Sequence, residues 1–386
     1  MKVLWLCSWY PNKLDKFGGD FIERHAIALS SIIPIDVIHI VQNNTRLKNA
    51  KAATEVSCHS NIRFILKIIP YHITGFSFLN KIIFNWRYIR QLKNLLDQYI
   101  QENGKPDLVH VHVPVKMGAG ALYLKKKYNV PFVATEHNSA YFNYIPENYH
   151  NSSNYFRYIT RKTFESAMAV SSVSHWLLNR LSDLFTLKSE MMIRNVVDDS
   201  FFFYVPTSNN VKRFIHVSMM EPLKNVKGIL DACIALNVFH TSWELVLVGP
   251  CTKEYQQLVR NSGIGDKVIF TGLITYPEVA SQMRNADVLV HFSRYENLPC
   301  VINEALCCGL TVITSDVGGI HEIISEDNGI MVQSEDVIGL KNAIDYYLGN
   351  SERYSRKNIA AQAASVYNYK TIGLELYNWY KDLLKG

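Results

Sequence analysis

Short hydrophobic runs rich in β-branched residues alternate with amphipathic stretches along almost the whole chain. This alternation predicts parallel sheets built from β-α-β units. In the first half, the predicted strands are Val3–Cys7, Asp36–Val41, Ile62–Ile68, Leu108–Val113, Phe132–Thr135 and Ala169–Val173. Helices are predicted between them, over Asp20–Ser31, Leu79–Tyr99 and Lys116–Tyr128.

A second series of strands begins after a break in the pattern. Ser200–Asn210 holds three successive phenylalanines and then polar residues, which predicts an apolar anchor followed by a linker. The later predicted strands are Arg213–Val217, Glu244–Val248, Val268–Thr271, Val288–His291 and Thr311–Thr314. We therefore expect an α/β protein with two doubly wound domains, residues 1–204 and 205–365, and a C-terminal helix, 366–386, packing back on the first domain. Ligands of such sheets bind beyond the carboxyl ends of the strands.

Length and composition narrow the class of protein. The 386 residues, 48% of them hydrophobic, suffice for two cores and lack low-complexity runs. No stretch approaches the roughly 18–20 uninterrupted apolar residues of a membrane span, and the N-terminal apolar run is too short and too broken for a signal peptide. The seven cysteines are odd in number and without CxxC spacing. Free thiols in a reducing compartment, and hence a cytoplasmic protein, are expected.

The charge is unevenly distributed. Residues 41–130 hold 14 Lys/Arg against 4 Asp/Glu, whereas residues 201–386 hold 16 against 19. Aromatic residues are interleaved in the basic stretch: Phe76, Phe78, Phe84, Trp86 and Tyr88. This pattern fits either contact with an anionic membrane surface or acceptor, or a solvated helix with an aromatic core face. Nucleic acid is not expected as a partner, because no recognised binding motif accompanies the charge.

Candidate chemistry is densest in Ser293–Glu322. Pro299 suits the first position of a helix that ends at Gly309, with Asn297 as a candidate N-cap. Glu296 lies before this helix, and Glu304 lies on it among apolar residues, where a carboxylate needs hydrogen-bond donors. The free amides of a helix N-terminus favour an anion there.

These residues form an E-x7-E pair, Glu296 and Glu304, followed by E-A-x-x-x-G and G-G-x-x-E. The segment resembles the donor-site signature of the retaining glycosyltransferase family 4. The resemblance implies the GT-B fold, with two Rossmann-like domains facing each other across a cleft. It also implies that Glu304 holds the ribose hydroxyls of a nucleotide and that Glu296 lies by the transferred sugar. A carboxylate can accept two charge-assisted hydrogen bonds from a vicinal diol.

The resemblance extends along the chain. F-G-G-D-F, with Gly18 and Gly19, resembles the family's glycine loop, whose amides face the donor diphosphate. T-E-H places His137 at the family's active-site histidine, and I-R-N-V-V-D (193–198) resembles the segment before the linker. M-E-P-L-K-N-V-K-G (220–228) places Lys224, and not Lys227, at the diphosphate-binding lysine. Further matches are Val-Gly-Pro (248–250) and Phe-Thr-Gly (270–272).

Two features need separate notice. The family commonly carries an arginine five residues before the lysine, where this chain has Met219; Lys224 then acts alone, another cation such as Arg294 compensates, or activity is weakened.

His110 and His112 alternate onto one face of a strand. Because no third ligand is evident nearby, we expect no metal, with His110 in the core and His112 lining the cleft.

The resemblance thus implies a hexosyltransferase that moves a sugar, with retention, from a nucleoside diphosphate sugar to an acceptor hydroxyl. A UDP-sugar is the first expectation for the donor, no metal cofactor is expected, and the acceptor would be a saccharide or lipid-linked saccharide of bacterial surface polysaccharide or lipopolysaccharide assembly. Peripheral contact with the cytoplasmic face of an anionic membrane would suit such a role. Two alternatives stay open: a GT-B-type sugar-nucleotide epimerase, and a nucleotide-binding protein without turnover. The assigned residues are His137, Lys224 and Glu296 for catalysis, and Gly18, Gly19, Lys224, Glu296, Asn297, Leu298 and Glu304 for donor binding.

Overall fold

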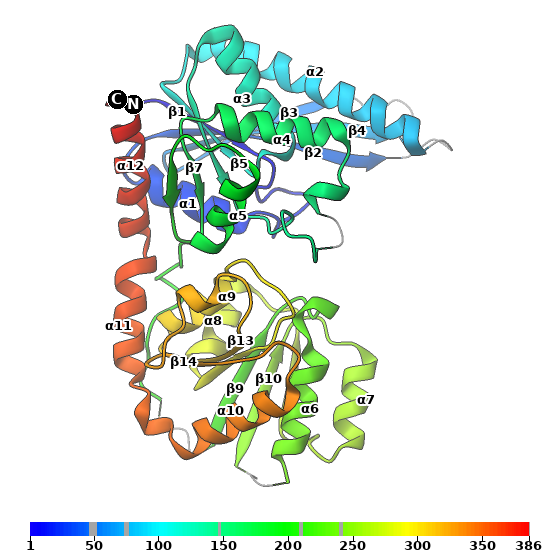
Figure 1. The fold of residues 1–386 in the computed structure, drawn as a ribbon, viewed down its shortest axis with the longest axis vertical. Helices are drawn as coiled ribbons and strands as arrows, with labels where there is room; N and C mark the ends of the chain where they lie inside the picture. The colour runs from blue at the N-terminus through cyan, green and yellow to red at the C-terminus, as the bar shows by residue number, and fades with distance from the viewer. Residues whose placement is uncertain (46–51, 73–76, 146–147, 208–210, 239–241, 386) are drawn as a thin grey trace. The chain divides into compact units, whose positions relative to one another are not determined.

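The computed structural model describes residues 1–45, 52–72, 77–145, 148–207, 211–238 and 242–385 (Figure 1). The chain forms two compact units, Met1–Arg194 with Tyr369–Gly386, and Asn195–Asn368. The first boundary therefore falls ten residues before the expected position at 204/205, because Phe202 is buried in the core of the second unit. Phe76 and residues 208–210 of the expected linker lie outside the described residues, as does the side chain of Phe78.

The first unit contains an eight-stranded sheet in the order β3-β4-β2-β1-β5-β6-β7-β8. Every pair is parallel except β3 with β4. The strands are β1 (Val3–Cys7), β2 (Ile35–Thr45), β3 (Ala53–His59), β4 (Ile62–His72), β5 (Leu108–His112), β6 (Phe132–Glu136), β7 (Val170–Ser172) and β8 (Glu190–Met192). The six strands predicted from the sequence are confirmed. β3 and β8 were not predicted, because β3 is exposed at every position and β8 is only three residues long.

Helices cover both faces of this sheet, as right-handed crossovers from a doubly wound sheet require (Figure 1). They are α1 (Asp20–Ser30), α2 (Ser77–Asn103), α3 (Pro114–Tyr128), α4 (Asn154–Ser166), α5 (His175–Leu184) and the C-terminal α12 (Tyr369–Lys385). α12 packs on α1. A Cβ at Gly373 of α12 would lie 2.4 Å from the Ala28 carbonyl oxygen, so only glycine permits this close approach. The C-terminal helix is therefore part of the first unit.

The second unit contains a six-stranded, fully parallel sheet in the order β11-β10-β9-β12-β13-β14. Its strands are β9 (Lys212–Val217), β10 (Trp243–Val248), β11 (Val268–Gly272), β12 (Val288–His291), β13 (Thr311–Ser315) and β14 (Gly329–Val332). Its helices are α6 (Val226–Leu236), α7 (Lys253–Asn261), α8 (Tyr276–Arg284), α9 (Cys300–Cys307), α10 (Val337–Gly349) and α11 (Arg356–Tyr367). β14 was not predicted, but the other five strands were.

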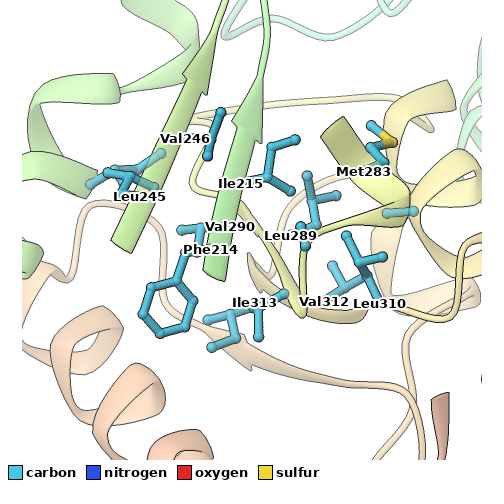
Figure 2. Packing of buried hydrophobic residues seen from close by; sticks show 14 of the residues in the cluster. Phe214, Ile215, Leu245, Val246, Met283, Leu289, Val290, Leu310, Val312 and Ile313 are labelled. Atoms are coloured by element: carbon cyan, nitrogen blue, oxygen red, sulfur yellow. The ribbon is translucent and has the colours of Figure 1, made fainter. Parts of the chain in front are cut away.

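Side chains from neighbouring strands form the core of the second unit. Figure 2 shows Phe214 and Ile215 of β9 beside Leu245 of β10 and Val290 of β12. Burying each such side chain stabilises the fold by about 1.5–3 kcal/mol. The middle of each of these strands is buried on both faces, which is why hydrophobic residues dominate there, while Arg213 and Glu244 lie at the starts of β9 and β10.

The aromatic residues of the basic stretch lie largely on α2. Phe84 and Tyr88 are buried against the core of the first unit, whereas Trp86 is 62% exposed. The aromatic residues therefore serve both as a core face and as exposed surface. Among the described residues, no helix combines the length and the apolar character needed to cross a membrane.

Candidate functional site

The two loops that carry Lys224 and Glu296 meet at the point where the second sheet reverses its strand order. β9 lies between β10 and β12, so the chain leaves the loops after β9 and β12 in opposite directions and continues on opposite faces of the sheet. Such a switch point leaves a crevice at the carboxyl ends of the strands, which is where open α/β sheets bind ligands. Lys224 follows β9 and Glu296 follows β12.

Glu296 is held by two basic side chains. Its Oε1 accepts hydrogen bonds from Lys224 Nζ at 2.5 Å and from His291 Nε2 at 2.9 Å. Burial alone would raise the pKa of this carboxyl, but the hydrogen bonds and charges of His291 and Lys224 outweigh burial and lower the pKa to about 2. Glu296 is therefore an anion at every physiological pH. Since an ammonium has three donors, Lys224 retains capacity for a further anion.

The Lys224 loop is fastened to the Glu296 loop by Arg294. The guanidinium of Arg294 donates hydrogen bonds to the Pro222 carbonyl and, at 3.2 Å, to Asn225 Oδ1. The same group pairs with the carboxylate of Glu335 at 2.8 Å. Arg294 therefore positions the loop of Lys224. Met219, at the position where the family commonly has arginine, is 57% exposed.

Two glycines after β13 support the backbone of the Glu296 loop. A Cβ at Gly318 would lie 2.0 Å from the Glu296 carbonyl oxygen, and its φ of +62° favours glycine. The Gly319 amide donates to the Asn297 carbonyl at 2.8 Å. The Leu298 carbonyl accepts from the Asn195 side chain at 3.3 Å. Asn297 and Leu298 are both buried, so their backbone is held firmly between these partners.

The helix after this loop begins one residue later than predicted. α9 starts at Cys300, and Pro299, with an extended ψ of 127°, occupies the N-cap position. Asn297 is therefore not the N-cap, since Pro299 holds that position two residues later. The predicted end is confirmed, because Gly309 follows the helix with φ +76°.

Glu304 lies on the buried face of α9 and is 6% exposed. Its Oε1 accepts a hydrogen bond from the hydroxyl of Tyr276, the first residue of α8, at 2.9 Å. A capping box of Thr275 and Glu278 fixes the start of α8 and thereby the place of Tyr276. The hydroxyl of Tyr276 thus orients the carboxylate.

In the first unit, Gly18 and Gly19 form the loop before α1. The Gly18 amide donates to Asp15 Oδ1 at 2.8 Å. Gly19 has φ +84°, and a Cβ there would lie 2.7 Å from the Trp9 backbone. Because Asp15 already binds the Gly18 amide, a diphosphate could use this amide only after the carboxylate has moved away.

His137 follows β6 and is enclosed by aromatic rings. Its ring centroid lies 4.8 Å from that of Phe21, which belongs to the same F-G-G-D-F motif as Gly18 and Gly19. Burial lowers the pKa of His137 well below its usual value, so its ring is neutral at pH 7. The carboxylate of the adjacent Glu136 accepts hydrogen bonds from the backbone amides of His137 and Asn138, both at 2.9 Å. Burial raises the pKa of Glu136 to about 7, despite these hydrogen bonds.

Two further histidines lie behind His137. His112 is 1% exposed, and its Nδ1 lies 3.4 Å from His137 Nε2. The expectation that His112 lines a cleft is therefore wrong; it is covered by His137. His110 is in the core, as predicted, between Thr135 and the hydroxyl of Tyr380 on α12. No group of three or more potential metal ligands occurs within the described ranges.

Three residues of these sites were not named from the sequence: His291, Tyr276 and Glu136. His291 ends β12 and Glu136 ends β6, so their places at strand ends are a usable signal. Tyr276 had no such signal, because its contact with Glu304 joins two helices far apart along the chain.

Comparison with known families agrees with this geometry. Residues 39–201 match the family model described as Glycosyltransferase Family 4, and residues 198–365 match the model described as Glycosyl transferases group 1. The two matches together cover most of both units. The chain belongs to glycosyltransferase family 4. It is therefore a GT-B enzyme that transfers glycosyl groups from nucleotide sugars.

Relatives of this family 4 glycosyltransferase are distant in sequence. It is 23% identical, over 90% of this chain and 89% of the relative, to TuaC of Bacillus subtilis, which is named as a putative teichuronic acid biosynthesis glycosyltransferase. Its fold resembles that of sucrose-phosphate synthase from Thermosynechococcus elongatus, with a TM-score of 0.76 at 20% identity and full coverage of both chains. It also resembles Anabaena HepE in complex with UDP, with a TM-score of 0.74 at 18% identity, over 99% of this chain and all of HepE.

Proposed function

We propose that this enzyme transfers a hexose from a UDP-sugar, with retention of anomeric configuration, to a saccharide acceptor in bacterial surface polysaccharide assembly. The observation that carries the proposal is the Lys224–Glu296 pair at the switch point of the second sheet. A cation and an oriented carboxylate side by side at this position suit a donor that has both a diphosphate and a hydroxylated sugar.

The residues have distinct proposed roles. Lys224 binds the diphosphate and stabilises the negative charge that grows on it as the glycosidic bond breaks. Glu304, oriented by Tyr276, accepts hydrogen bonds from the ribose hydroxyls. Glu296 orients hydroxyls of the transferred sugar. Because two basic groups already hold it and its pKa is about 2, Glu296 is a poor proton acceptor and a poor nucleophile.

His137 acts through a neutral ring. Since burial keeps the ring uncharged at pH 7, it can donate or accept one hydrogen bond to the sugar or acceptor without adding charge. The backbone amides around Gly18 and Gly19 are proposed to meet the diphosphate once Asp15 releases them. Lys224 supplies the positive charge that a metal provides in other transferases, so we expect activity without added metal.

The choice of donor and acceptor class rests on the relatives. HepE binds UDP, which favours uridine as the base. TuaC is named for teichuronic acid biosynthesis, which favours a surface polymer as the product. The basic first domain is consistent with an anionic acceptor or with contact at the cytoplasmic face of an anionic membrane.

A nucleotide panel followed by product analysis tests the proposal. Thermal stability of the purified chain is measured with UDP, GDP, ADP and their common sugar conjugates. UDP at about one hundred times its Kd should stabilise the folded chain by about 2.7 kcal/mol. The anomeric proton of the product is then read by NMR, with EDTA present. Equal or absent responses to all three nucleotides would contradict the donor assignment, and an inverted anomer would contradict retention.

A further inference from the structure

A cavity of about 140 Å³ lies in the first unit between α2, α3 and α4. Its lining includes Val115 and Lys116, in the first turn of α3. α3 follows β5, so Val115 and Lys116 lie near the carboxyl end of that strand. Open α/β sheets bind ligands beyond the carboxyl ends of their strands.

Lys116 is in an unfavourable place for a cation. It is half-buried, and burial lowers its pKa. Throughout the described part of the chain, no carboxylate forms an ion pair with it; its Nζ instead lies 5.0 Å and 5.1 Å from the ring centroids of Phe84 and Tyr88. The first turn of a helix also repels positive charge, because the helix dipole is positive at that end.

Polar side chains also line the cavity. Asn85 of α2 is exposed there, and so is Ser153, the N-cap of α4. The Ser153 oxygen accepts from the Phe156 amide at 3.2 Å, which leaves the hydroxyl proton available as a donor. Tyr155 completes this side of the cavity and is 55% exposed. The site therefore offers a cation and neutral donors around a small space.

We propose that this cavity binds an anionic oxygen group, a phosphate or a carboxylate, on the acceptor. The identification of the ligand as the acceptor rests on the proposed function. Lys116 is four residues from His112, which contacts His137, so the cavity lies at the same edge of the sheet as that histidine. A bound anion would supply the negatively charged partner that Lys116 lacks within the described part of the protein. The volume of the cavity suits a single charged group and not a whole lipid.

The direct test is calorimetric titration of the full chain with inorganic phosphate, with the donor site filled by UDP. Lys116→Met keeps the apolar stem and removes the charge. Lys93→Met is the matched control, because Lys93 also lies over an aromatic ring, that of Tyr123, but lines no part of this cavity. Lys116→Met should weaken phosphate binding by about tenfold or more, as expected for the loss of a charge-assisted hydrogen bond, whereas Lys93→Met should leave it unchanged.

Equal affinities of the wild type and Lys116→Met for both phosphate and acetate would overturn the proposal. The melting temperatures of both variants are measured to show that they are folded, because Lys116→Met also removes the contacts of the ammonium with the rings of Phe84 and Tyr88.

A parallel titration with acetate identifies the source of the charge. A stronger Lys116-dependent response to phosphate supports an acceptor phosphate, a stronger response to acetate supports a uronic acid, and no such response to either contradicts the site. UDP binding is measured separately in the same samples. Its failure would count against the proposed function, while the comparison of Lys116→Met with wild type would still decide this site.

Discussion

Replacement of Glu296 by glutamine should reduce stability at neutral pH and much less in acid. The carboxylate is 10% exposed and is bound by Lys224 and His291. Its pKa is lowered from 4.5 to about 2 in the folded protein. A group with a lowered folded-state pKa stabilises the fold fully above its unfolded-state pKa, and this contribution disappears as the pH falls through the folded-state value.

The size of the effect follows from the difference between the two pKa values. It corresponds to about 3 kcal/mol at pH 7 and to about 1 kcal/mol at pH 3. Glutamine can still accept a hydrogen bond, so the measured loss should be somewhat smaller than these values. The dependence on pH, rather than the absolute loss, is therefore the quantity to test.

Urea unfolding of the wild type and Glu296→Gln at pH 7 and pH 3 measures this dependence, with the transition of the second unit followed in each case. The difference in the free energy of unfolding between the two proteins should be at least halved at pH 3. Glu335→Gln is the control, because Glu335 pairs with Arg294 but is 64% exposed, and exposed pairs contribute little. A difference that is equal at the two pH values, or no larger than that of the control, would refute the assigned electrostatics.

Two further substitutions probe the parts that position the carboxylates. Gly318→Ala places a Cβ against the Glu296 carbonyl at positive φ, so it should lower the free energy of unfolding, measured by thermal unfolding, by more than about 1 kcal/mol. Gly265→Ala is the control and should cause no such loss, because nothing lies within 4 Å of a Cβ there. Equal melting temperatures of the two variants would contradict the close approach at Gly318. Tyr276→Phe removes the hydroxyl that donates a hydrogen bond to Glu304. It should raise the KM for the nucleotide sugar by about tenfold with little change in stability, as for loss of one hydrogen bond to a charged group. An unchanged KM would show that Glu304 takes no part in binding the nucleotide sugar.

Much of the fold could be predicted because buried parallel strands are distinctive. Val288–His291 and Val3–Cys7 were predicted with their observed bounds, since a short hydrophobic run flanked by turn residues is typical of a strand buried on both faces. β3 has no buried face, and its strand conformation depends on pairing with β4. Pairing of that kind leaves no periodic pattern of hydrophobic residues in the sequence.

The site was predictable where it follows strand ends and unpredictable where it depends on contacts across the fold. The pattern of strands placed Glu296 and Lys224 in loops after strands, and the family resemblance marked both as site residues. The structure pairs them. The sequence could not show that His291 shares Glu296, that Asp15 binds the Gly18 amide, or that His112 is covered. Each of these facts depends on the direction of a side chain within a folded loop.

The most direct test of the account compares UDP affinity in Lys224→Met and Lys227→Met. The two lysines are three residues apart, but Lys224 binds Glu296 at the switch point, while Lys227 is 62% exposed and pairs with Asp231 on the surface of α6. Calorimetry should show UDP binding weakened by about tenfold or more in Lys224→Met, the loss expected for a charge-assisted contact with phosphate, and unchanged in Lys227→Met. Equal affinities in the two variants would contradict a donor site between β9 and β12.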